Sequence, residues 1–383
     1  MLSTPLVQLV AASTLAASAL AQSSFVPLAA KRFDYNDLPE KADNGTGERG
    51  AQVGYNRCNE TTQNQESYCQ TAIINSIDDF CLWAPPEYGE EVGNIEGEMV
   101  AWCTKEGHGT RLIPEGALQG VQFMRTPHYV QVVGFIDQQK VNILPEDYGG
   151  EMDPHGADQR GNPLGGLLFS TAFGANSTTN GTAADGSAYQ QVVQWHNFMG
   201  GSTFCLKACD PSWENGWAVC EHIFDRLGCV YNAPADYASI NGTYTSCEGE
   251  DQLPPGQYDD AQGVRQTYTQ PPESLGVIST IPYEPFTPAS SNCETFQSAA
   301  LYTAGADIVA STSSAAPSSA TSAPASSGAS SGASASSGAS STAQGTATAG
   351  SAAASESGTS GAEKVVAGGV LGGVGALFAA FLA

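Results

Sequence analysis

Apolar residues in the middle of the chain have the alternation and the β-branched composition that favour strands. Residues 129–136 are the clearest case, because Tyr-Val-Gln-Val-Val-Gly-Phe-Ile is rich in β-branched and aromatic side chains and lies between Thr-Pro and Asp. Similar composition elsewhere predicts further strands, so the central region is expected to be mainly β and sandwich-like with a few short helices. The predicted strands are 121–123, 129–136, 141–144, 167–173 and 190–198.

Two segments instead have apolar residues at helical spacing, which predicts helices. The first consists of Cys69, Ile73, Ser76, Ile77 and Phe80, and the second of Trp217, Cys220, Ile223, Phe224 and Leu227. Gly228 follows the second segment in the position that favours a left-handed cap. The Pro-rich residues 252–288 show no period and are predicted to wrap the core in extended form up to Cys293.

The two ends of the chain carry hydrophobic signals. Residues 6–19 are apolar or small and lead to Ala19-Leu20-Ala21, which predicts a secretory signal peptide. Near the other end, small residues 357–361 precede a short polar stretch, and residues 365–383 are apolar, as in a GPI-attachment signal. The alternative for this last run is a retained transmembrane helix. We expect an extracellular protein, anchored by lipid to the plasma membrane or transferred to the cell wall.

Composition divides the rest of the chain. Residues 303–358 are dominated by Ser, Ala, Gly and Thr, which cannot bury enough apolar surface to fold and therefore predict a disordered stalk. Lys31-Arg32 resembles the cleavage site of a kexin-type processing protease, although an ordinary exposed basic pair has the same sequence. The predicted organisation is a signal peptide at 1–21, a propeptide at 22–32, an ectodomain at 33–302, the stalk at 303–358 and a removed signal at 359–383, with Gly358 or Ser360 as the attachment residue.

The ten cysteines of the chain are expected to form disulfides, because a secreted protein meets an oxidising environment. Zinc binding by Cys205 and Cys209 is the alternative, but no second pair follows at finger spacing. We predict that every bond stays within one of two groups. These are Cys58, Cys69, Cys81 and Cys103, and then Cys205, Cys209, Cys220, Cys229, Cys247 and Cys293.

The chain is acidic, with 39 Asp and Glu residues against 14 Lys and Arg. Such a surface repels nucleic acid, so no nucleic-acid partner is expected, and in a secreted chain it is more typical of solubility than of cation binding. Sequons that predict N-glycosylation begin at Asn44, Asn59, Asn176, Asn180 and Asn241.

Catalytic motifs do not assemble in this sequence. The Gly-x-Ser-x-Gly match at 328–332 lies in the predicted stalk, and neither a His-Glu-x-x-His nor a phosphate-binding loop is present. Adjacent carboxylates, Asp78-Asp79 and Glu90-Glu91, point apart and give no support for glycoside hydrolysis, which requires two carboxyl groups facing one another. No catalytic residue, metal or cofactor is therefore assigned.

One loop is a speculative site. Asp153, His155 and Asp158 precede Arg160, and a histidine between two carboxylates could bind a metal or act as a base. The simpler interpretation is a solvated loop tied by an Asp–Arg pair. The single histidines His128 and His196, near predicted strands, are interpreted as satisfied structural residues.

Several blocks of sequence resemble one known family. They are residues 160–166 (Arg-Gly-Asn-Pro-Leu-Gly-Gly), 194–198 (Gln-Trp-His-Asn-Phe), 204–211 (Phe-Cys-Leu-Lys-Ala-Cys-Asp-Pro) and 220–232, which begins Cys-Glu-His-Ile-Phe-Asp. Over roughly residues 55–247 the chain resembles the fungal macrophage-activating glycoproteins. The resemblance implies a secreted or GPI-linked fungal surface glycoprotein with a serine-rich tail and without an established enzymatic activity.

We therefore expect a non-enzymatic, GPI-anchored fungal surface glycoprotein of the surface-display, cell-wall or host-interaction type. Its expected partners are the plasma membrane through the lipid anchor, and cell-wall glycans or host receptors. The alternative is a secreted carbohydrate-active protein, either a lectin or a glycan-modifying enzyme, which exposed aromatic rings would support. The five tryptophans are nevertheless predicted to be core residues: Trp83, Trp102, Trp195, Trp213 and Trp217.

Overall fold

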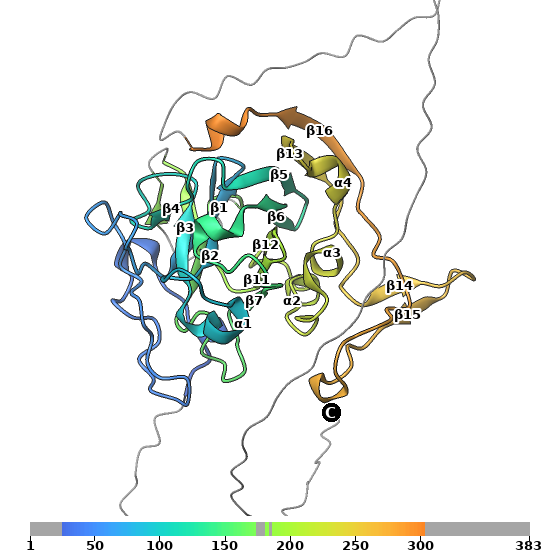
Figure 1. Ribbon diagram of the computed structural model, residues 1–383, viewed down its shortest axis with the longest axis horizontal. Helices are drawn as coiled ribbons and strands as arrows, with labels where there is room; N and C mark the ends of the chain where they lie inside the picture. The colour runs from blue at the N-terminus through green and yellow to red at the C-terminus, as the bar shows by residue number, and fades with distance from the viewer. Residues whose placement is uncertain (1–24, 174–180, 184–185, 303–383) are drawn as a thin grey trace, which may run out of the picture. The chain divides into compact units, whose positions relative to one another are not determined.

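The computed structural model describes residues 25–173, 181–183 and 186–302. All of them belong to one compact unit of the chain. Within these residues the strands form two seven-stranded sheets and one two-stranded sheet, and the helices are short (Figure 1). The predicted mainly β fold is therefore confirmed. The predicted signal peptide, stalk and GPI signal lie outside the described residues.

The first sheet is built around the antiparallel pair of β1 and β2. β1 also pairs in parallel with β8, where Thr71 lies opposite Leu167. All six residues of β2 are buried, so this strand is apolar on both faces. The strand order is β4 (Arg111–Leu112), β3 (Val100–Cys103), β2 (Asp79–Ala84), β1 (Thr71–Ser76), β8 (Leu167–Ser170), β10 (Ala188–Val192) and β9 (Gly181–Thr182).

The second sheet is centred on the long antiparallel strands β5, β6 and β12. β6 alternates, so that Val130 and Val132 enter the core and Gln131 and Val133 face the other side. One end of the sheet is the short edge strand β7. The strand order is β16 (Ser290–Thr295), β13 (Tyr244–Gly249), β5 (Leu118–Arg125), β6 (Tyr129–Ile136), β12 (Thr203–Cys209), β11 (Trp195–Gly200) and β7 (Gly150–Met152).

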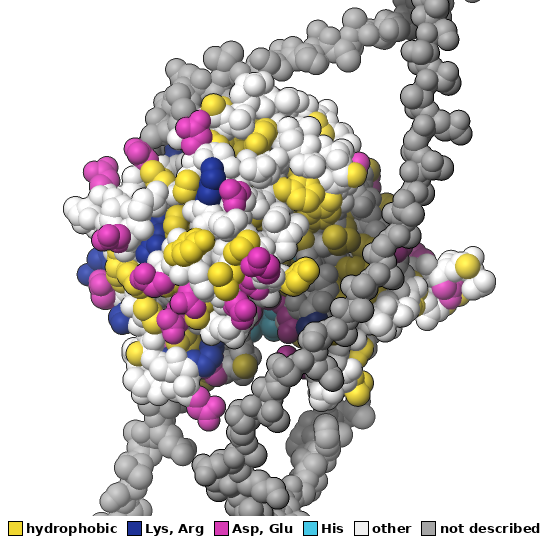
Figure 2. All heavy atoms as spheres, viewed as in Figure 1, with side chains coloured by type: hydrophobic (Ala, Val, Ile, Leu, Met, Phe, Trp, Pro, Cys, Tyr) yellow, Lys and Arg dark blue, Asp and Glu magenta, His cyan; other side chains and the backbone are white. Residues whose placement is uncertain are grey.

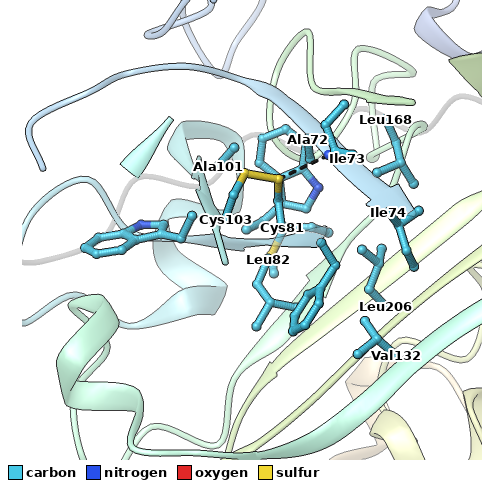
Figure 3. Close-up of a cluster of buried hydrophobic side chains, with 14 of the residues drawn as sticks. Ala72, Ile73, Ile74, Cys81, Leu82, Ala101, Cys103, Val132, Leu168 and Leu206 are labelled. Carbon is cyan, nitrogen blue, oxygen red and sulfur yellow. Dashed lines mark hydrogen bonds between the residues drawn. A yellow bond between two sulfur atoms is a disulfide. The ribbon is translucent and has the colours of Figure 1, made fainter. Parts of the chain in front are cut away.

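The main core lies between the two seven-stranded sheets, as in a sandwich. Ile74 from the first sheet meets Val132 and Leu206 from the second (Figure 3). Trp83 of β2 and Trp195 of β11 stack with 6.0 Å between their ring centroids. Burial of such large apolar side chains is the main force that holds two sheets face to face.

The helix predicted from residues 69–80 is wrong, because this segment forms the hairpin of β1 and β2. Ile73 and Ile74 are both buried, although neighbouring strand residues point to opposite faces. The strand is covered on both faces and therefore has apolar residues at consecutive positions, among which a helical spacing occurs by coincidence.

The second predicted helix is also wrong in extent. The helix α2 covers only Gly216–Val219, and Trp217 and Ile223 of the predicted apolar stripe are 59% and 57% exposed. Gly228 has a positive φ of 66°, but it begins α3 (Gly228–Asn232) instead of ending a helix. Helices this short are not stable alone, and disulfides at both ends of the segment fix its path instead.

Among the predicted strands, only 141–144 is wrong. Val141 ends a 3-10 turn, and Asn142 follows in the left-handed region at φ 71°. Predicted strand 167–173 ends at Ser170, and 190–198 is divided between β10 and β11. Of the tryptophans, Trp83, Trp102 and Trp195 are core residues as predicted, and Trp213 packs partly buried against a smaller cluster. The prediction is wrong for Trp217, which is exposed.

The remaining elements are short. Residues 252–288 are largely irregular, as predicted, but include the hairpin of β14 and β15. The remaining helices and strands are α1 (Val92–Ile95), α4 (Tyr237–Ile240), β14 (Gln257–Asp259), β15 (Arg265–Thr267) and the 3-10 helices Leu28–Ala30, Tyr35–Asp37, Glu96–Glu98, Gln138–Val141, Glu273–Leu275 and Ser298–Tyr302.

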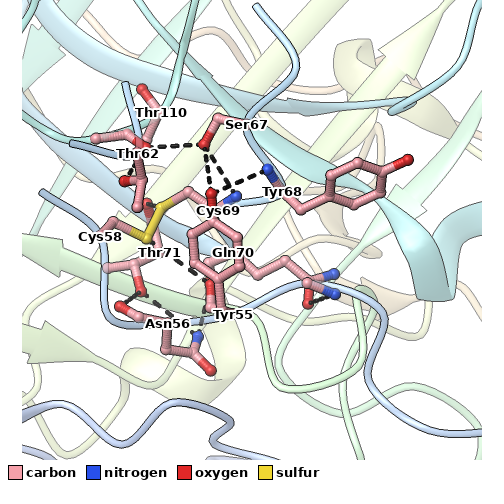
Figure 4. The surroundings of a disulfide bond; sticks show 12 residues. Tyr55, Asn56, Cys58, Thr62, Ser67, Tyr68, Cys69, Gln70, Thr71 and Thr110 are labelled. Atoms are coloured by element: carbon pink, nitrogen blue, oxygen red, sulfur yellow. Dashed lines mark hydrogen bonds between the residues drawn. A yellow bond between two sulfur atoms is a disulfide. The ribbon is translucent and has the colours of Figure 1, made fainter. Parts of the chain in front are cut away.

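All ten cysteines are paired, and every bond stays within its predicted group. The Cys58–Cys69 bond lies among hydrogen-bonded polar side chains; nearby, the Asn56 amide donates to the carbonyl oxygen of Gln70 (Figure 4). Two bonds attach the segment after β12 to that strand, and one pins β16 to β13. The bonds are Cys58–Cys69, Cys81–Cys103, Cys205–Cys229, Cys209–Cys220 and Cys247–Cys293.

Candidate functional site

The outer face of the second sheet, away from the main core, carries polar side chains. Lys207 of β12 lies opposite Gln131 of β6 and His196 of β11, and all three are buried. Residues 210–232 cover this face, because Cys209–Cys220 and Cys205–Cys229 hold them against β12. Strand alternation alone would have left these polar groups in solvent, so the cover creates the buried site.

Lys207 has a structural role in this face. Its ammonium group donates to the carbonyl oxygen of Asn232 and to Oε1 of Gln252, and its Nζ atom lies 5.1 Å from the centroid of the Tyr129 ring. Burial lowers the pKa of Lys207 well below its ordinary value of 10.5. The side chain therefore ties the covering segment and the start of the Pro-rich region to β12.

His196 is fully buried beside Lys207. Its Nδ1 atom lies 3.1 Å from the carbonyl oxygen of Glu221, and its buried Nε2 atom has no protein partner. Burial and the nearby Lys207 lower the pKa of His196 well below 6.5, so the ring is neutral and donates through Nδ1. The prediction of a satisfied structural histidine is therefore only half right for His196, because Nδ1 has a partner and Nε2 has none.

The same prediction is confirmed for His128. Its Nδ1 atom lies 2.5 Å from a carboxylate oxygen of Asp251, and its ring stacks on Trp213 with 4.4 Å between centroids.

A cavity of about 710 Å³ opens beside the edge strand β7. Carboxylates from four parts of the chain line it: Glu96, Glu151, Asp225 and Glu273. We call this cavity the acidic cleft. On the face shown in Figure 2, histidine side chains appear in a recess next to acidic ones.

Glu96 is the best-connected carboxylate of the acidic cleft. Its Oε1 atom accepts a hydrogen bond from the backbone N–H of Glu151 at 3.1 Å, and Oε2 accepts one from the side-chain amide of Asn162 at 2.9 Å. Burial raises the pKa of Glu96 to about 7, and the charges of Asp153 and Asp225 act in the same direction. The group can therefore gain or lose a proton near neutral pH.

Glu151 is more deeply buried. It lies on β7, only 4% of its surface is exposed, and its Oε1 atom has no protein partner. Burial raises the pKa of Glu151 well above 4.5, and Asp153, Asp225, Glu96 and Glu221 add to the effect. A buried carboxylate without a donor is costly, so this residue is the strongest indication of function in the cleft.

The predicted site at Asp153, His155 and Asp158 does not assemble. The Asp153 carboxylate accepts hydrogen bonds from the backbone N–H groups of His155 and Gly156, whereas Asp158 forms an ion pair with Arg49. In the part of the chain that the structure describes, no group of three His, Cys, Asp or Glu residues could hold a metal ion.

The simpler interpretation of this loop is therefore half right. Asp158 lies 3.7 Å from Arg160, as an Asp–Arg tie requires. Asp153, however, is only 6% exposed, and burial raises its pKa. It belongs with Glu96 and Glu151 behind the acidic cleft and not with Asp158.

A stacked pair of histidines lies next to this loop. The rings of His155 and His222 are nearly parallel, with 3.8 Å between their centroids. Burial and His155 lower the pKa of His222 to about 4. His222 comes from the covering segment, so this stack joins the covering segment to the 153–160 loop.

Of the acidic pair Asp78-Asp79, Asp79 lines a second, smaller cavity of about 480 Å³. The Asp79 carboxylate lies 2.6 Å from Nε2 of His108 and 3.7 Å from Nζ of Lys105, and it also accepts from Asn75. Burial alone would raise the pKa of Asp79, but the hydrogen bond and charge of His108 outweigh burial and lower it. Its oxygens are thus occupied by protein partners.

Three predicted glycosylation sites are exposed, as glycan attachment requires: Asn44, Asn59 and Asn241. Asn176, Asn180 and the attachment residues Gly358 and Ser360 lie outside the described residues. Within 25–173, 181–183 and 186–302, no helix has the length and apolar character needed to cross a membrane.

The residues of the acidic cleft were not found from the sequence. Glu96 belongs to a short turn, and Glu151 and Asp225 lie far from it in the chain, so no spacing connects them. The one available signal is a glutamate in a short strand, next to Met152 of the core, where alternation places it on the outer face of the sheet.

Comparisons with known proteins give two relatives, whereas no protein-family model and no solved structure matches the chain. Appressorium protein ROW1 of Mycosarcoma maydis is 48% identical over 212 residues, which are 55% of this chain and 46% of ROW1. Appressorium protein ROW2 of the same fungus is 38% identical over 261 residues, which are 66% of this chain and 82% of ROW2. The chain thus matches less than half of ROW1 and most of ROW2.

Proposed function

Because this chain belongs to the family of the appressorium proteins ROW1 and ROW2, we propose that it is a fungal surface glycoprotein that acts where the fungus meets its host. The family membership carries the proposal. Five disulfides support it, because such bonds persist in proteins outside the cell. The resemblance to macrophage-activating glycoproteins stays a prediction.

The proposal includes a GPI anchor and a glycosylated ectodomain that acts by display and contact, without catalysis. The apolar run at 365–383 and the small residues before it support the anchor. The exposed sequons at Asn44, Asn59 and Asn241 support glycosylation.

Phosphatidylinositol-specific phospholipase C tests the anchor. Full-length protein is expressed on cells without wall cross-links, and the enzyme is expected to release it into the medium. A control variant carries bulky residues at both candidate sites, Gly358→Trp and Ser360→Trp, and should not reach the surface in a releasable form. Protein that stays in the membrane fraction after treatment would establish the retained-helix alternative instead.

A second candidate function, a glycan-directed activity, is favoured by the acidic cleft. Glu96 and Glu151 lie in one cavity, and carbohydrate-active sites use carboxyl groups with raised pKa values as acids and hydrogen-bonding groups. The side chain of Tyr148 at this cavity is 93% exposed and could stack on a sugar ring.

Incubation of the full-length protein with β-glucan and chitin oligomers tests this second candidate. Release of shorter oligomers that disappears in Glu96→Gln and persists in Glu284→Gln would establish a hydrolase. Saturable binding without cleavage would establish a lectin. The absence of both would leave surface display as the function.

A further inference from the structure

Among the lining residues of the acidic cleft, acidic side chains outnumber basic ones by four to one. Among its lining residues, Arg226 is the only cation that the described chain supplies, and its guanidinium donates to the carbonyl oxygens of Pro271 and Gly276. Arg49, which lies near Glu96, is committed to Asp158. A ligand that carries positive charge would therefore complete the site.

The unpartnered oxygen of Glu151 gives an independent indication of such a ligand. Its Oε1 atom has no donor from the protein, although the residue is only 4% exposed and lines the cleft. A protein normally supplies a partner to a carboxyl oxygen in this position, because burying a polar group without a hydrogen bond is costly. An N–H donor of a bound molecule at the floor of the cleft would provide that partner.

The arrangement of the carboxylates favours an extended organic cation over a metal ion. Glu96, Glu151 and Asp225 line one cavity, yet no three acidic or histidine side chains of the described residues converge as metal ligands would. Ammonium groups spaced along a chain match separate carboxylates better than one ion does. The volume of about 710 Å³ is in the range of ligand sites.

The wall of the cleft is suited to a sugar. The backbone at Gly149 packs directly against the backbone at Met199 and Gly200. A Cβ atom added to Gly149 would lie 1.7 Å from the carbonyl oxygen of Met199, so no side chain fits here and the wall is bare backbone. The exposed ring of Tyr148 stands beside it, and aromatic rings stack on the apolar faces of sugars. A sugar ring can lie flat against such a surface.

We propose that the acidic cleft binds a glycan that carries free amino groups, with one ammonium donating to Glu151 and a neighbouring sugar stacked on Tyr148. The inference rests on the glycan-directed candidate function and names its ligand class. It requires no bond to be broken. An ammonium group of the ligand would supply the hydrogen bond that Glu151 lacks. The ring of Tyr148 and the glycine wall favour a sugar as the molecule that bears this ammonium group.

Calorimetric titration of the full-length glycoprotein in mild detergent tests the proposal, with a glucosamine hexamer and an N-acetylglucosamine hexamer as matched probes. The amine-bearing hexamer is expected to bind at least about tenfold more tightly, because acetylation removes the charge that Glu151 recognises. Glu151→Gln and Tyr148→Ala should each weaken its binding about tenfold. Glu284→Gln, which alters an exposed carboxylate outside the cleft, should bind like the unaltered chain.

Each other outcome has a defined meaning. Equal binding of both hexamers would overturn the amine requirement and leave the glycan-directed function standing, whereas binding of neither would reject both. A lysine pentamer that binds as tightly as the glucosamine hexamer, with no loss in Tyr148→Ala, would point to a basic peptide and overturn the sugar ligand. Tyr148 is exposed, so Tyr148→Ala keeps the test valid even if Glu151→Gln fails to fold.

Discussion

The backbone N–H of Glu151 donates a hydrogen bond to the carboxylate of Glu96, with 3.1 Å between the nitrogen and Oε1. This contact joins the turn at Glu96–Glu98 to the edge strand β7 and sets two acidic side chains in one cleft. Both groups are buried enough to raise their pKa values. The cleft therefore couples local stability to proton binding.

Glu96 should make stability fall as pH rises through the weakly acidic range. Folding raises its pKa from 4.5 to about 7, so the folded state binds more protons than the unfolded state in that interval. The stabilisation is fully present below the unfolded pKa and is lost as pH approaches the folded value. We expect a loss of about 1–3 kcal/mol in the free energy of unfolding.

Urea unfolding at a series of pH values measures this loss. Glu96→Gln should flatten the dependence across that interval, and Glu284→Gln should leave it unchanged. An equally steep fall in Glu96→Gln and in Glu151→Gln would show that other groups are responsible.

The buried ion pair of Asp43 and Arg160 should be sensitive to loss of one partner. Their closest atoms are 2.5 Å apart, and the side chains are 2% and 5% exposed. Asp43→Asn leaves the buried guanidinium with only the more distant Asp158 carboxylate, 3.7 Å away, and is expected to cost about 3–5 kcal/mol in chemical unfolding. Arg265→Gln, which breaks the exposed pair with Asp259, should have no measurable effect. Similar losses in both variants would contradict the role assigned to burial.

Removal of the Cys81–Cys103 bond and removal of the Cys247–Cys293 bond should have different consequences. Cys81 and Cys103 lie opposite each other in β2 and β3 and are fully buried, so Cys81→Ala with Cys103→Ala is expected to lower global stability by about 2–5 kcal/mol. Cys247–Cys293 instead holds the exposed strand β16. Its removal should open residues 252–295 to limited proteolysis at temperatures where the core stays folded. Uniform proteolysis in both variants would argue against local release.

Gly149→Ala should destabilise the wall of the acidic cleft more than the same change at Gly50. Both glycines have positive φ, 93° and 81°, so both alanines carry conformational strain of about 1–2 kcal/mol. Only Gly149 has backbone within 2 Å of the added Cβ, whereas Gly50 has no atom within 4 Å. Thermal unfolding should therefore show a clearly larger drop for Gly149→Ala. Equal drops would mean that β7 can shift to accept the methyl group.

The sequence alone determined the classes of structure and the two groups within which the cysteines pair. Strands such as β6 were predictable because β-branched side chains and alternation are local properties of the chain. The grouping of the disulfides was also predictable, because Cys205, Cys209, Cys220 and Cys229 are close along the chain and form bonds with one another. The strand β1 was predicted as a helix because apolar residues occupy consecutive positions in it and some of them fall at helical spacing. These positions are apolar because the strand is covered on both faces, which is a tertiary property.

Only the tertiary structure decided where the chemistry lies. The predicted partners Asp153 and Asp158 are close in sequence but turn apart, toward the acidic cleft and toward Arg49. Glu96 and Glu151 meet because a turn docks on an edge strand, and Asp225 joins them because two disulfides carry its segment across the outer face. Burial and mutual repulsion then change their proton affinities. These effects depend on distances in the folded chain, and no residue spacing in the sequence encodes them.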